Sequence, residues 1–541
     1  YTLNPSDFDL ANYSLEQLAG EGPQYNANAS LAILQGKGTD AHNAAIVVNV
    51  AALLYLTGKA ETLKEGTKQV QTLLSSGQAM NTLNAIIEVS NSKNSVADKK
   101  LELIERKAAR PLESFKHLAV PTSRSFYKAL AAPGTQFILE CKKASPSKGL
   151  IREPFDLTEI TSVYKKYATC MSVLTDAKYF QGSFDYLEFV RSQVEQPLIC
   201  KDFFIDEYQV YMARIYGGDA ILLMLSVLDD ESYKALHAVA DSLNMSVLTE
   251  VSNEEEVHRA LALDAQIIGI NNRDLRDLST DLATTEKLRK LIPADKVVIS
   301  ESGIYTHQDV KRLAPLCDGF LIGSSLMGER DLEQACRRVI LGDNKVCGLT
   351  RTKDAQAAYQ NGAIYGGLIF HPKSPRYVDL DCAKELSQSA PLNFVGVFVD
   401  APIDQVAQYA SVLKLAAVQL HGQESDDYIA QLRTQLPTGC EIWKAQAIKD
   451  ALPTPVNGVD RHLYDTHSDT QAGGTGKAFD WSVLHDATTP FMLAGGLNPD
   501  NIKDALFKGA LGLDLNSGVE ESAGKKCPNK LHNAFTSIRN Y

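Results

Sequence analysis

The 541-residue chain has no cysteine pattern of a disulfide-stabilised or zinc-binding protein. Its nine cysteines are scattered, none forms a CxxC pair, and no cysteine and histidine cluster has zinc-site spacing. An odd number of scattered cysteines is typical of a reducing compartment, so we expect a cytoplasmic protein without a bound metal.

Positive net charge and long apolar runs are also missing. The net charge of −12 argues against non-specific nucleic-acid binding, although local basic pockets for phosphates remain compatible with it. The most apolar stretch, residues 44–57, is shorter than the ~20 residues of a membrane span and contains Asn49. We therefore expect neither a nucleic-acid nor a membrane partner. No signal peptide is recognisable, and the start at Tyr1 rather than Met suggests a piece of a longer chain.

The chain changes character twice along its length. Residues 1–93 carry apolar residues at three- and four-residue spacing, which predicts helices. The polar stretch NSKNS at residues 91–95 predicts a linker, and a charged helix follows that ends before Pro111. From Phe137 onward, eight short apolar runs alternate with helix-like segments, and a second set of eight begins at Lys345.

Sixteen such units predict an α/β protein made of two tandem (β/α)8 TIM barrels. Near-continuous apolar runs are typical of parallel strands that are covered on both faces. One open sheet is the alternative, but open sheets of that size are rare. We therefore predict a small, mainly α-helical segment over residues 1–93 and barrels over residues 94–342 and 343–541.

Polar residues close the apolar runs of the first predicted barrel. Lys201 ends PLICK, Glu250 ends SVLTE and Asn271 ends IIGIN, and this fold builds its active sites at the carboxyl ends of its strands. A lysine that faces a glutamate across a pocket forms an acid/base pair. Glu140 and Lys142 stand two residues apart on the first strand, so they share one face, where the lysine suits an anionic substrate.

Small residues after several strands predict a phosphate site in the same barrel. Ser145 lies in the loop after the first strand, and Arg273 follows the sixth. SESGI and LIGSS, after the seventh and eighth strands, offer free backbone N–H groups at Ser302, Gly303, Gly323 and Ser324. A lone strand-end lysine is more often a surface ion pair, and a glycine–serine pair a plain turn. The convergence of five strand ends favours a site.

The second predicted barrel has a thiol and a carboxyl at its strand ends. Cys347 lies in KVCGLTR and Asp465 in HLYDTH, and such a pair is the minimum needed for an aldose-to-ketose isomerisation. A thiolate would be the active base. Arg376, in KSPRYV, suits a two-pronged contact with an aromatic carboxylate. A strand cysteine alone is more often a small core residue.

Further substrate contacts are expected around this pair. They are His421, Gly474, Thr475, Gly476, Gly495, Gly496, Asp514, Ser517 and Gly518. The glycines belong to GGTG, AGG and NSG stretches, which follow the last three strands and offer backbone donors to a phosphate. Taken singly, GGTG reads as a flexible turn and His421 as a capping histidine.

The first barrel resembles indole-3-glycerol phosphate synthase over residues 96–342. The motifs that carry the resemblance are ILECKKASPSKG, ICKDFFID, LTEVSNEEE, GINNRDL, SESGI and LIGSSLM. It implies closure of the indole ring of a carboxyphenylamino-deoxyribulose phosphate with loss of carbon dioxide and water. It also implies Lys201 as general acid, Glu250 as the acid/base group of dehydration, and Lys142 as partner of the substrate carboxylate or a sharer of the dehydration proton transfer. Glu140 and Asn271 would orient these groups.

The second barrel resembles phosphoribosylanthranilate isomerase over residues 345–541. KVCGLTR, SPRYV, VQLHG, GGTGKAFDW and LAGGLNPDN carry this resemblance. It implies Cys347 as the base at the sugar C2′, Asp465 as the acid on the ring oxygen, and Arg376 as the anchor of the anthranilate carboxylate. The product of this Amadori rearrangement would be the substrate of the first barrel, in the order of the fused bacterial enzymes of tryptophan synthesis.

Residues 1–93 resemble the C-terminal part of anthranilate phosphoribosyltransferase. The glycine-rich GTGGD-like loop of that family is absent, so we expect no transferase activity from this segment. We interpret it as the remnant of a longer three-enzyme fusion, with an independent docking module as the alternative.

The resemblances together imply phosphorylated small-molecule substrates, no metal or organic cofactor, and association with other tryptophan-pathway subunits. Two other functions remain open. A tandem-barrel isomerase of another sugar-phosphate pathway, such as a histidine-pathway enzyme, would use paired aspartates where this chain has Cys347 and Asp465. A non-catalytic metabolite-binding scaffold would have lost at least one acid/base group, and none is missing.

Overall fold

The computed structural model describes residues 3–20, 22–273, 279–466 and 479–540. The chain divides into two compact units. We call Tyr1–Leu112, with Ala144–Gly149 and Asn272–Asp281, the helical unit, and the remainder the barrel unit. Each unit is described by itself. Within the described residues, no helix is both long enough and apolar enough to cross a bilayer.

The helical unit is built on a small apolar core. Phe8, Val47, Ala51 and Val70 are buried together. α2 packs closely on α3 because Gly66 carries no side chain, and a Cβ there would stand 2.9 Å from the carbonyl oxygen of Ala51. The elements are η1 (Pro5–Phe8), η2 (Glu16–Leu18), α1 (Pro23–Leu34), α2 (Asp40–Leu56), α3 (Leu63–Ser75) and α4 (Gln78–Ala109).

The linker predicted at residues 91–95 is wrong, because α4 is continuous through it from Gln78 to Ala109. The segment contains neither glycine nor proline, and the helix penalties of Asn and Ser are too small to end a long helix. α4 ends two residues before Pro111, as the sequence predicts, since the residue before a proline avoids helical dihedrals.

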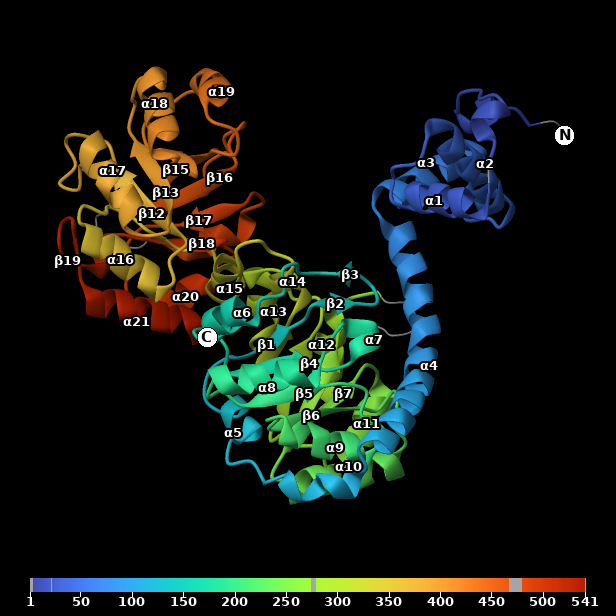
Figure 1. Ribbon diagram of the computed structural model, residues 1–541. Helices are drawn as coiled ribbons and strands as arrows, with labels where there is room; N and C mark the ends of the chain where they lie inside the picture. Colours follow the sequence, from blue (N-terminus) through green and yellow to red (C-terminus); the bar gives the residue numbers. More distant parts are fainter. Residues whose placement is uncertain (1–2, 21, 274–278, 467–478, 541) are drawn as a thin grey trace. The chain divides into compact units, whose positions relative to one another are not determined.

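The first barrel closes because β1 (Gln136–Cys141) pairs in parallel with both β4 (Cys170–Leu174) and β10 (Gly319–Ile322). Figure 1 shows β1 and β4 with helices around them. Its strands are β1 (Gln136–Cys141), β4 (Cys170–Leu174), β5 (Leu198–Lys201), β6 (Ala220–Met224), β7 (Ser246–Val251), β8 (Ile267–Asn271), β9 (Val297–Glu301) and β10 (Gly319–Ile322). The loop after β1 contains two short strands, β2 (Ala144–Ser145) and β3 (Gly149–Leu150).

Helices follow the strands of this barrel, as the alternating pattern predicts. They are α6 (Leu157–Tyr164), α7 (Ala177–Phe180), α8 (Phe184–Gln193), α9 (Glu207–Ile215), α10 (Asp230–Ser242), α11 (Glu254–Ala262), α12 (Ala283–Leu288), α13 (His307–Leu313), α14 (Ser324–Met327) and α15 (Leu332–Leu341). Most begin at a side-chain cap. Asp206, for example, accepts a hydrogen bond from the amide of Tyr208 at the start of α9.

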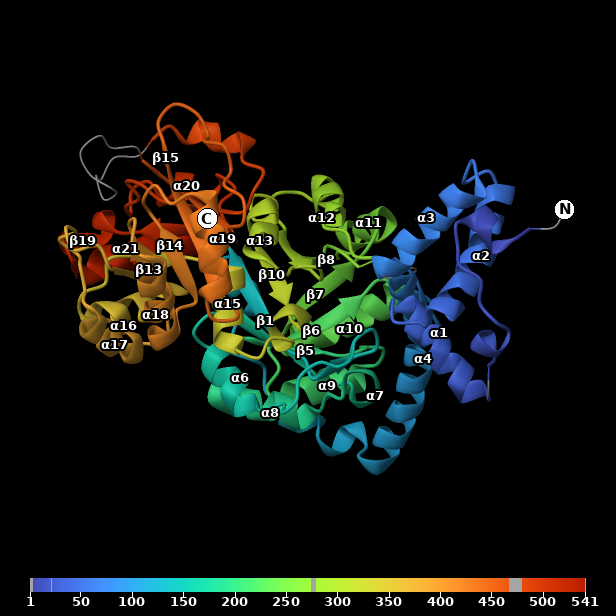
Figure 2. The same cartoon turned by 90° about the horizontal axis from the view of Figure 1, so that it is seen from above.

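The second barrel closes in the same way, with β11 pairing to both β12 and β18. Its strands are β11 (Lys345–Val346), β12 (Tyr365–Ile369), β13 (Asn393–Phe398), β14 (Ala417–Leu420), β15 (Glu441–Ile448), β16 (Arg461–Thr466), β17 (Phe491–Leu493) and β18 (Gly512–Leu515). Its helices are α16 (Thr352–Asn361), α17 (Leu380–Ser389), α18 (Ile403–Leu413), α19 (Asp426–Gln435), α20 (Ile502–Leu506) and α21 (Pro528–Arg539), and Figure 2 shows them around the strands.

Two closed parallel barrels confirm the predicted fold class and exclude a single open sheet. A short antiparallel hairpin, β19 (Glu520–Ser522) and β20 (Lys525–Lys526), was not predicted. It follows β18 and the short η7 helix (Ser517–Val519). The hairpin carries Glu520 and Lys526, and Glu520 contacts Arg376 of the second site.

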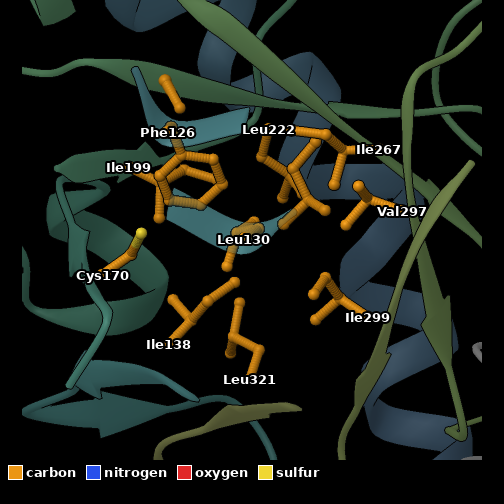
Figure 3. Packing of buried hydrophobic residues seen from close by; sticks show 12 residues of the cluster. Phe126, Leu130, Ile138, Cys170, Ile199, Leu222, Ile267, Val297, Ile299 and Leu321 are labelled. Carbon is orange, nitrogen blue, oxygen red and sulfur yellow. The ribbon is translucent and has the colours of Figure 1, made fainter. Parts of the chain in front are cut away.

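One end of the first barrel is filled by an apolar plug. Phe126 and Leu130, from α5 (Phe126–Leu130), pack against the first residues of several strands, including Cys170, Ile267 and Val297 (Figure 3). Burying a phenylalanine side chain contributes up to about 3 kcal/mol. Because this end is filled with hydrocarbon, polar groups that point inward are confined to the opposite, carboxyl ends of the strands.

The two barrels share buried polar contacts where α15 leads into β11. Arg337, on α15, donates to the hydroxyl of Tyr167 at 2.8 Å and to Glu333 at 2.7 Å, both in the first barrel. The same guanidinium donates to the carbonyl oxygens of Tyr359 at 2.6 Å and Ala363 at 3.1 Å in the second barrel. One buried side chain therefore satisfies polar groups of both barrels.

We predict that Arg337→Ala lowers the free energy of unfolding by about 3 kcal/mol, because it leaves buried partners of a charged group unpaired. Denaturant titration of the full chain, followed by circular dichroism, measures this loss. Arg330→Ala is the matched control, since Arg330 is exposed and its loss should change stability by no more than about 0.5 kcal/mol. Equal effects of the two substitutions would contradict the role of Arg337.

Candidate active sites

The first site is centred on Lys201 at the carboxyl end of β5. Its Nζ lies 3.3 Å from Oε2 of Glu140, on β1, and 3.0 Å from Oε2 of Glu301, on β9. These strands are not neighbours in the barrel, so the lysine bridges its mouth. Both glutamates are almost fully buried. A buried lysine between two carboxylates is held in one position.

Glu140 also holds Lys142, whose Nζ lies 2.6 Å from Oε1 of the glutamate. Lys142 donates to the hydroxyl of Ser324 at 3.3 Å, so it connects the β1 end with the start of α14. Gly323 leaves the space that this arrangement needs, because a Cβ there would overlap Oε1 of Glu140. Glu140 and Lys142 therefore contact each other and the loop after β10 at the mouth of the barrel.

Electrostatics keep Lys201 and Glu140 charged. Burial alone would raise the pKa of Glu140, but the ammonium groups of Lys142 and Lys201 outweigh it and hold the pKa at about 2. Burial alone would lower the pKa of Lys201, but the carboxylates of Glu140, Glu301 and Glu250 outweigh it and raise the pKa. Lys201 is therefore protonated at neutral pH.

Glu250, at the end of β7, titrates near neutrality. Burial is the main cause that raises its pKa to about 7, and the carboxylate of Glu301 raises it further. Lys201 and a hydrogen bond from Asn271 act in the opposite direction. The Asn271 amide donates to Oε1 of Glu250 at 3.2 Å. A carboxyl that exchanges its proton near pH 7 suits a group that both gives and accepts a proton.

The loops expected to hold phosphate follow β9 and β10, which are neighbours in the barrel. Ser302 and Gly303 have φ angles of 67° and 79°, in the left-handed region. A non-glycine residue is uncommon there, and such strained positions cluster at ligand sites. Ser324 begins α14 directly after Gly323. Phosphate binding by these four residues stays a prediction.

Ser145 and Arg273 belong to the helical unit, unlike the other predicted residues of the first site. Within that unit, Arg273 donates from Nη1 to the hydroxyl of Ser147 at 3.0 Å, and the hydroxyl of Ser145 accepts from the amide of Lys148 at 3.2 Å. Both residues are thus engaged within their own unit. Their contact with substrate stays a prediction.

Glu301 is the residue of the first site that was missed. It is the last residue of β9, and Glu250 is the next-to-last residue of β7, so the same strand-end signal is present in VVISES. Only the small residues that follow it were selected. The structure pairs Glu301 with Lys201, and its carboxylate is one cause of the raised pKa of Glu250.

The second site is a pocket lined by both Cys347 and Asp465. Cys347 follows β11 directly, and Asp465 lies near the end of β16. The pocket is also lined by Arg376, His421, Gly495, Gly496, Asp514 and Ser517. Gly518 is not a lining residue; a Cβ there would overlap the carbonyl oxygen of Leu497, so a close backbone approach requires this glycine.

Burial raises the pKa of both acid/base candidates in this pocket. It raises the pKa of the Cys347 thiol, against the opposing charge of Lys345. It raises the pKa of Asp465 to about 6, although the backbone amide of Thr466 donates to this carboxylate at 2.7 Å. Nε2 of His421 lies 3.8 Å from the other carboxylate oxygen of Asp465. Asp465 is thus far easier to protonate than an exposed aspartate.

Arg376 is held by a glutamate of the unpredicted hairpin. Its Nε lies 3.0 Å and its Nη2 2.8 Å from the carboxylate oxygens of Glu520 on β19. Nζ of Lys526, on β20, lies 2.8 Å from the same carboxylate. Glu520 fixes the orientation of the guanidinium beside the pocket. No strand-end or motif signal pointed to Glu520 or Lys526, because their role depends on the hairpin.

Gly474, Thr475 and Gly476 lie outside the described residues. Over the part of the chain that the structure does describe, no group of three or more His, Cys, Asp or Glu side chains could hold a metal ion.

Two (β/α)8 barrels in one chain, each with buried proton-transfer groups at its strand ends, define the class: a tandem pair of barrel enzymes. The family model "Indole-3-glycerol phosphate synthase" matches residues 92–339, and "N-(5'phosphoribosyl)anthranilate (PRA) isomerase" matches residues 344–537. Residues 1–80 match "Glycosyl transferase family, a/b domain".

Curated relatives agree over both barrels. "Tryptophan biosynthesis protein TrpCF" of Vibrio parahaemolyticus is 59% identical over 451 residues, which cover 82% of this chain and 93% of the relative. The proteins of the same name from Vibrio cholerae and Yersinia pestis are 56% and 54% identical, cover 82% of this chain, and are themselves covered to 95% and 94%. The chain belongs to the TrpCF family: it is a bifunctional indole-3-glycerol phosphate synthase and phosphoribosylanthranilate isomerase of tryptophan biosynthesis.

We predict that Glu301→Gln lowers the pKa of Glu250. The limb of the synthase pH profile that reflects this pKa should then shift by about one unit to lower pH. The reason is that a neighbouring carboxylate which raises the pKa of Glu250 has been removed. The pH dependence of kcat/KM for ring closure measures the shift. The exposed Glu255→Gln, on α11, is the matched control and should leave the profile in place. An unmoved limb in Glu301→Gln would contradict the coupling.

Proposed function

We propose that the second barrel carries out the earlier of the two reactions, with Cys347 and Asp465 as its proton-transfer groups. Asp465, protonated, donates to the ring oxygen of phosphoribosylanthranilate, and the sugar ring opens to an imine. The Cys347 thiolate removes the proton at C2′, and the resulting enolamine rearranges to the ketose. Both residues line one pocket, and the raised pKa of Asp465, about 6, makes its protonated form far more populated near neutral pH than that of an ordinary aspartic acid.

We propose that Arg376 anchors the anthranilate carboxylate in this reaction. Glu520 contacts Nε and Nη2 of the guanidinium, and the two-pronged geometry of arginine suits a planar carboxylate. His421, Asp514 and Ser517 would contact the sugar, and Gly495 and Gly496 the phosphate, with Gly518 shaping the neighbouring backbone. The predicted phosphate contacts of Gly474, Thr475 and Gly476 belong to the same proposal.

We propose that the first barrel then closes the indole ring. The Lys201 ammonium protonates the ketose carbonyl while the aryl carbon attacks it, after which carbon dioxide leaves. Glu250 removes and returns protons during the loss of water, and Lys142 binds the substrate carboxylate or shares this proton transfer. Glu140 and Asn271 hold these groups. The observation that carries the proposal is the contact of Lys201 with Glu140 and Glu301 at one barrel mouth.

Domain limits, setting and partners also belong to the proposal. We assign the synthase to residues 94–342 and the isomerase to residues 343–541, with residues 1–93 as a helical segment without transferase activity.

All nine cysteines are free, which supports a reducing cytoplasm. The phosphorylated substrates are small molecules. Association with other subunits of the tryptophan pathway is a prediction that size-exclusion chromatography with those subunits would test.

We predict that the two activities can be abolished separately. Cys347→Ala or Asp465→Ala should lower the isomerase rate by about 10²–10⁴-fold and leave the synthase unchanged, because each removes one acid/base group of one barrel. Lys201→Ala should do the reverse, so that the carboxyphenylamino-deoxyribulose phosphate accumulates.

Steady-state assays of both reactions with each purified variant measure this separation. Asp404→Ala, an exposed position on α18, is a control that should affect neither activity. A single substitution that silenced both reactions would contradict two independent sites.

A further inference from the structure

Lys345 is a fully buried lysine directly beneath the isomerase pocket. It lies on β11, two residues before Cys347, so the two side chains point to the same side of the barrel wall. Both lie over Gly367 of β12: a Cβ on this glycine would stand 2.7 Å from Sγ of Cys347 and 2.9 Å from Cε of Lys345. The end of the lysine and the thiol therefore share one small space.

The ammonium of Lys345 is held by two buried acceptors. Nζ lies 2.8 Å from Oδ2 of Asp514, on β18, and donates to Oε1 of Gln419, on β14, at 2.9 Å. Burial alone would lower the pKa of Lys345, but the Asp514 carboxylate and the Cys347 sulfur together outweigh it and raise the pKa, so the lysine stays a cation. An ammonium has three N–H donors, so one N–H remains besides those that Asp514 and Gln419 accept, on a side chain that shares its space with the Cys347 thiol.

The same contacts orient His421. Lys345 can only donate, so Gln419 accepts through Oε1 and its amide nitrogen is the donor to Nδ1 of His421, 3.1 Å away. Burial lowers the pKa of His421 to about 4, and the charges of Lys345 and Lys444 add to this, so the imidazole is neutral. Its proton then lies on Nε2, which faces Asp465 at 3.8 Å.

We propose that Lys345 is a positioning residue of the isomerase: its buried ammonium stabilises the Cys347 thiolate and, through Gln419, fixes the tautomer of His421 beside Asp465. The proposal deepens the proposed function and rests on Cys347 as the base. Lys345 has no exposed surface, so it acts through these groups rather than on the substrate. Asp514, Gln419 and His421 all line the pocket, which connects the buried lysine with the reacting atoms.

The charges around Cys347 decide how much Lys345 contributes. Lys345 and Lys526 lower the pKa of the thiol, whereas burial and Asp514 raise it, and the net effect is a raised pKa. Titratable and cationic groups that line the same pocket are His371, Arg376, His421 and Asp465. Lys345 is the strongest of the cations that lower the pKa of the Cys347 thiol. Because burial already raises this pKa, removing the Lys345 ammonium should raise it clearly further.

The test is Lys345→Met in the full chain, which keeps the length of the side chain and removes its charge. We expect the pH at which iodoacetamide alkylation of Cys347 reaches half its maximal rate to rise by about one unit or more. Isomerase kcat at pH 7 should fall about tenfold for each unit, with KM within about twofold. Mass spectrometry assigns the alkylated residue, with Cys347→Ala as the blank.

Gln419→Met is the matched control, since it disturbs the same hydrogen bonds but leaves the ammonium in place. It should change the alkylation midpoint by much less than Lys345→Met does. Circular dichroism and the thermal unfolding midpoint of each variant report whether the isomerase barrel is folded, and unchanged synthase activity reports the same for the other barrel. If Lys345→Met does not fold, Lys345→Gln, which can still hydrogen-bond to Asp514, takes its place with the same expected shift.

An alkylation midpoint that is the same in wild type and in the Lys345 variants would overturn the proposal. A shift that Gln419→Met reproduces in full would also overturn it, because packing rather than charge would then be the cause. Failure of the proposed function looks different: Cys347→Ala would keep isomerase activity, whatever Lys345 does to the thiol.

Discussion

The burial of charged side chains at the carboxyl ends of the strands is the constraint on which both sites depend. A charge taken out of water is costly unless an opposite charge replaces the water. In the first barrel, Lys201 meets this requirement between Glu140 and Glu301. Glu250 has no ammonium within salt-bridge distance among the described residues, and burial raises its pKa to about 7. Pairing thus leaves Lys201 protonated at neutral pH, whereas the Glu250 carboxyl exchanges its proton near pH 7.

The second barrel meets the same constraint with Lys345, a buried cation that does not line the pocket itself. Lys345 has no exposed surface and pairs with Asp514, and the end of its side chain lies beside the Cys347 thiol. Burial leaves Asp465 with a pKa of about 6 and raises that of Cys347.

The barrels were predictable from the sequence because their strands are short apolar runs that end in polar residues. Lys201 and Cys347 could be selected because each stands at such an end. Glu301 carried the same signal but was hidden beside the small residues of SESGI. Lys345 could not be selected, since a lysine at the start of a strand reads as exposed, and only barrel closure brings Asp514 next to it. Glu520 depends likewise on an unpredicted hairpin.

The junction between the barrels connects their two cores through a short buried segment, away from either site. Only residues 342–344 separate α15 from β11, and Asn344 is buried there, donating to the carbonyl of Leu341 and accepting from the amide of Leu513. The strand that leads to Cys347 is therefore anchored at its start by the last helix of the synthase. The groups proposed to transfer protons, however, lie at the carboxyl ends of the strands, and their ion-pair partners come from the same barrel. Shared stability and separate chemistry follow from the same connection, because a (β/α)8 barrel keeps the residues that stabilise it and the residues that react at opposite ends of its strands.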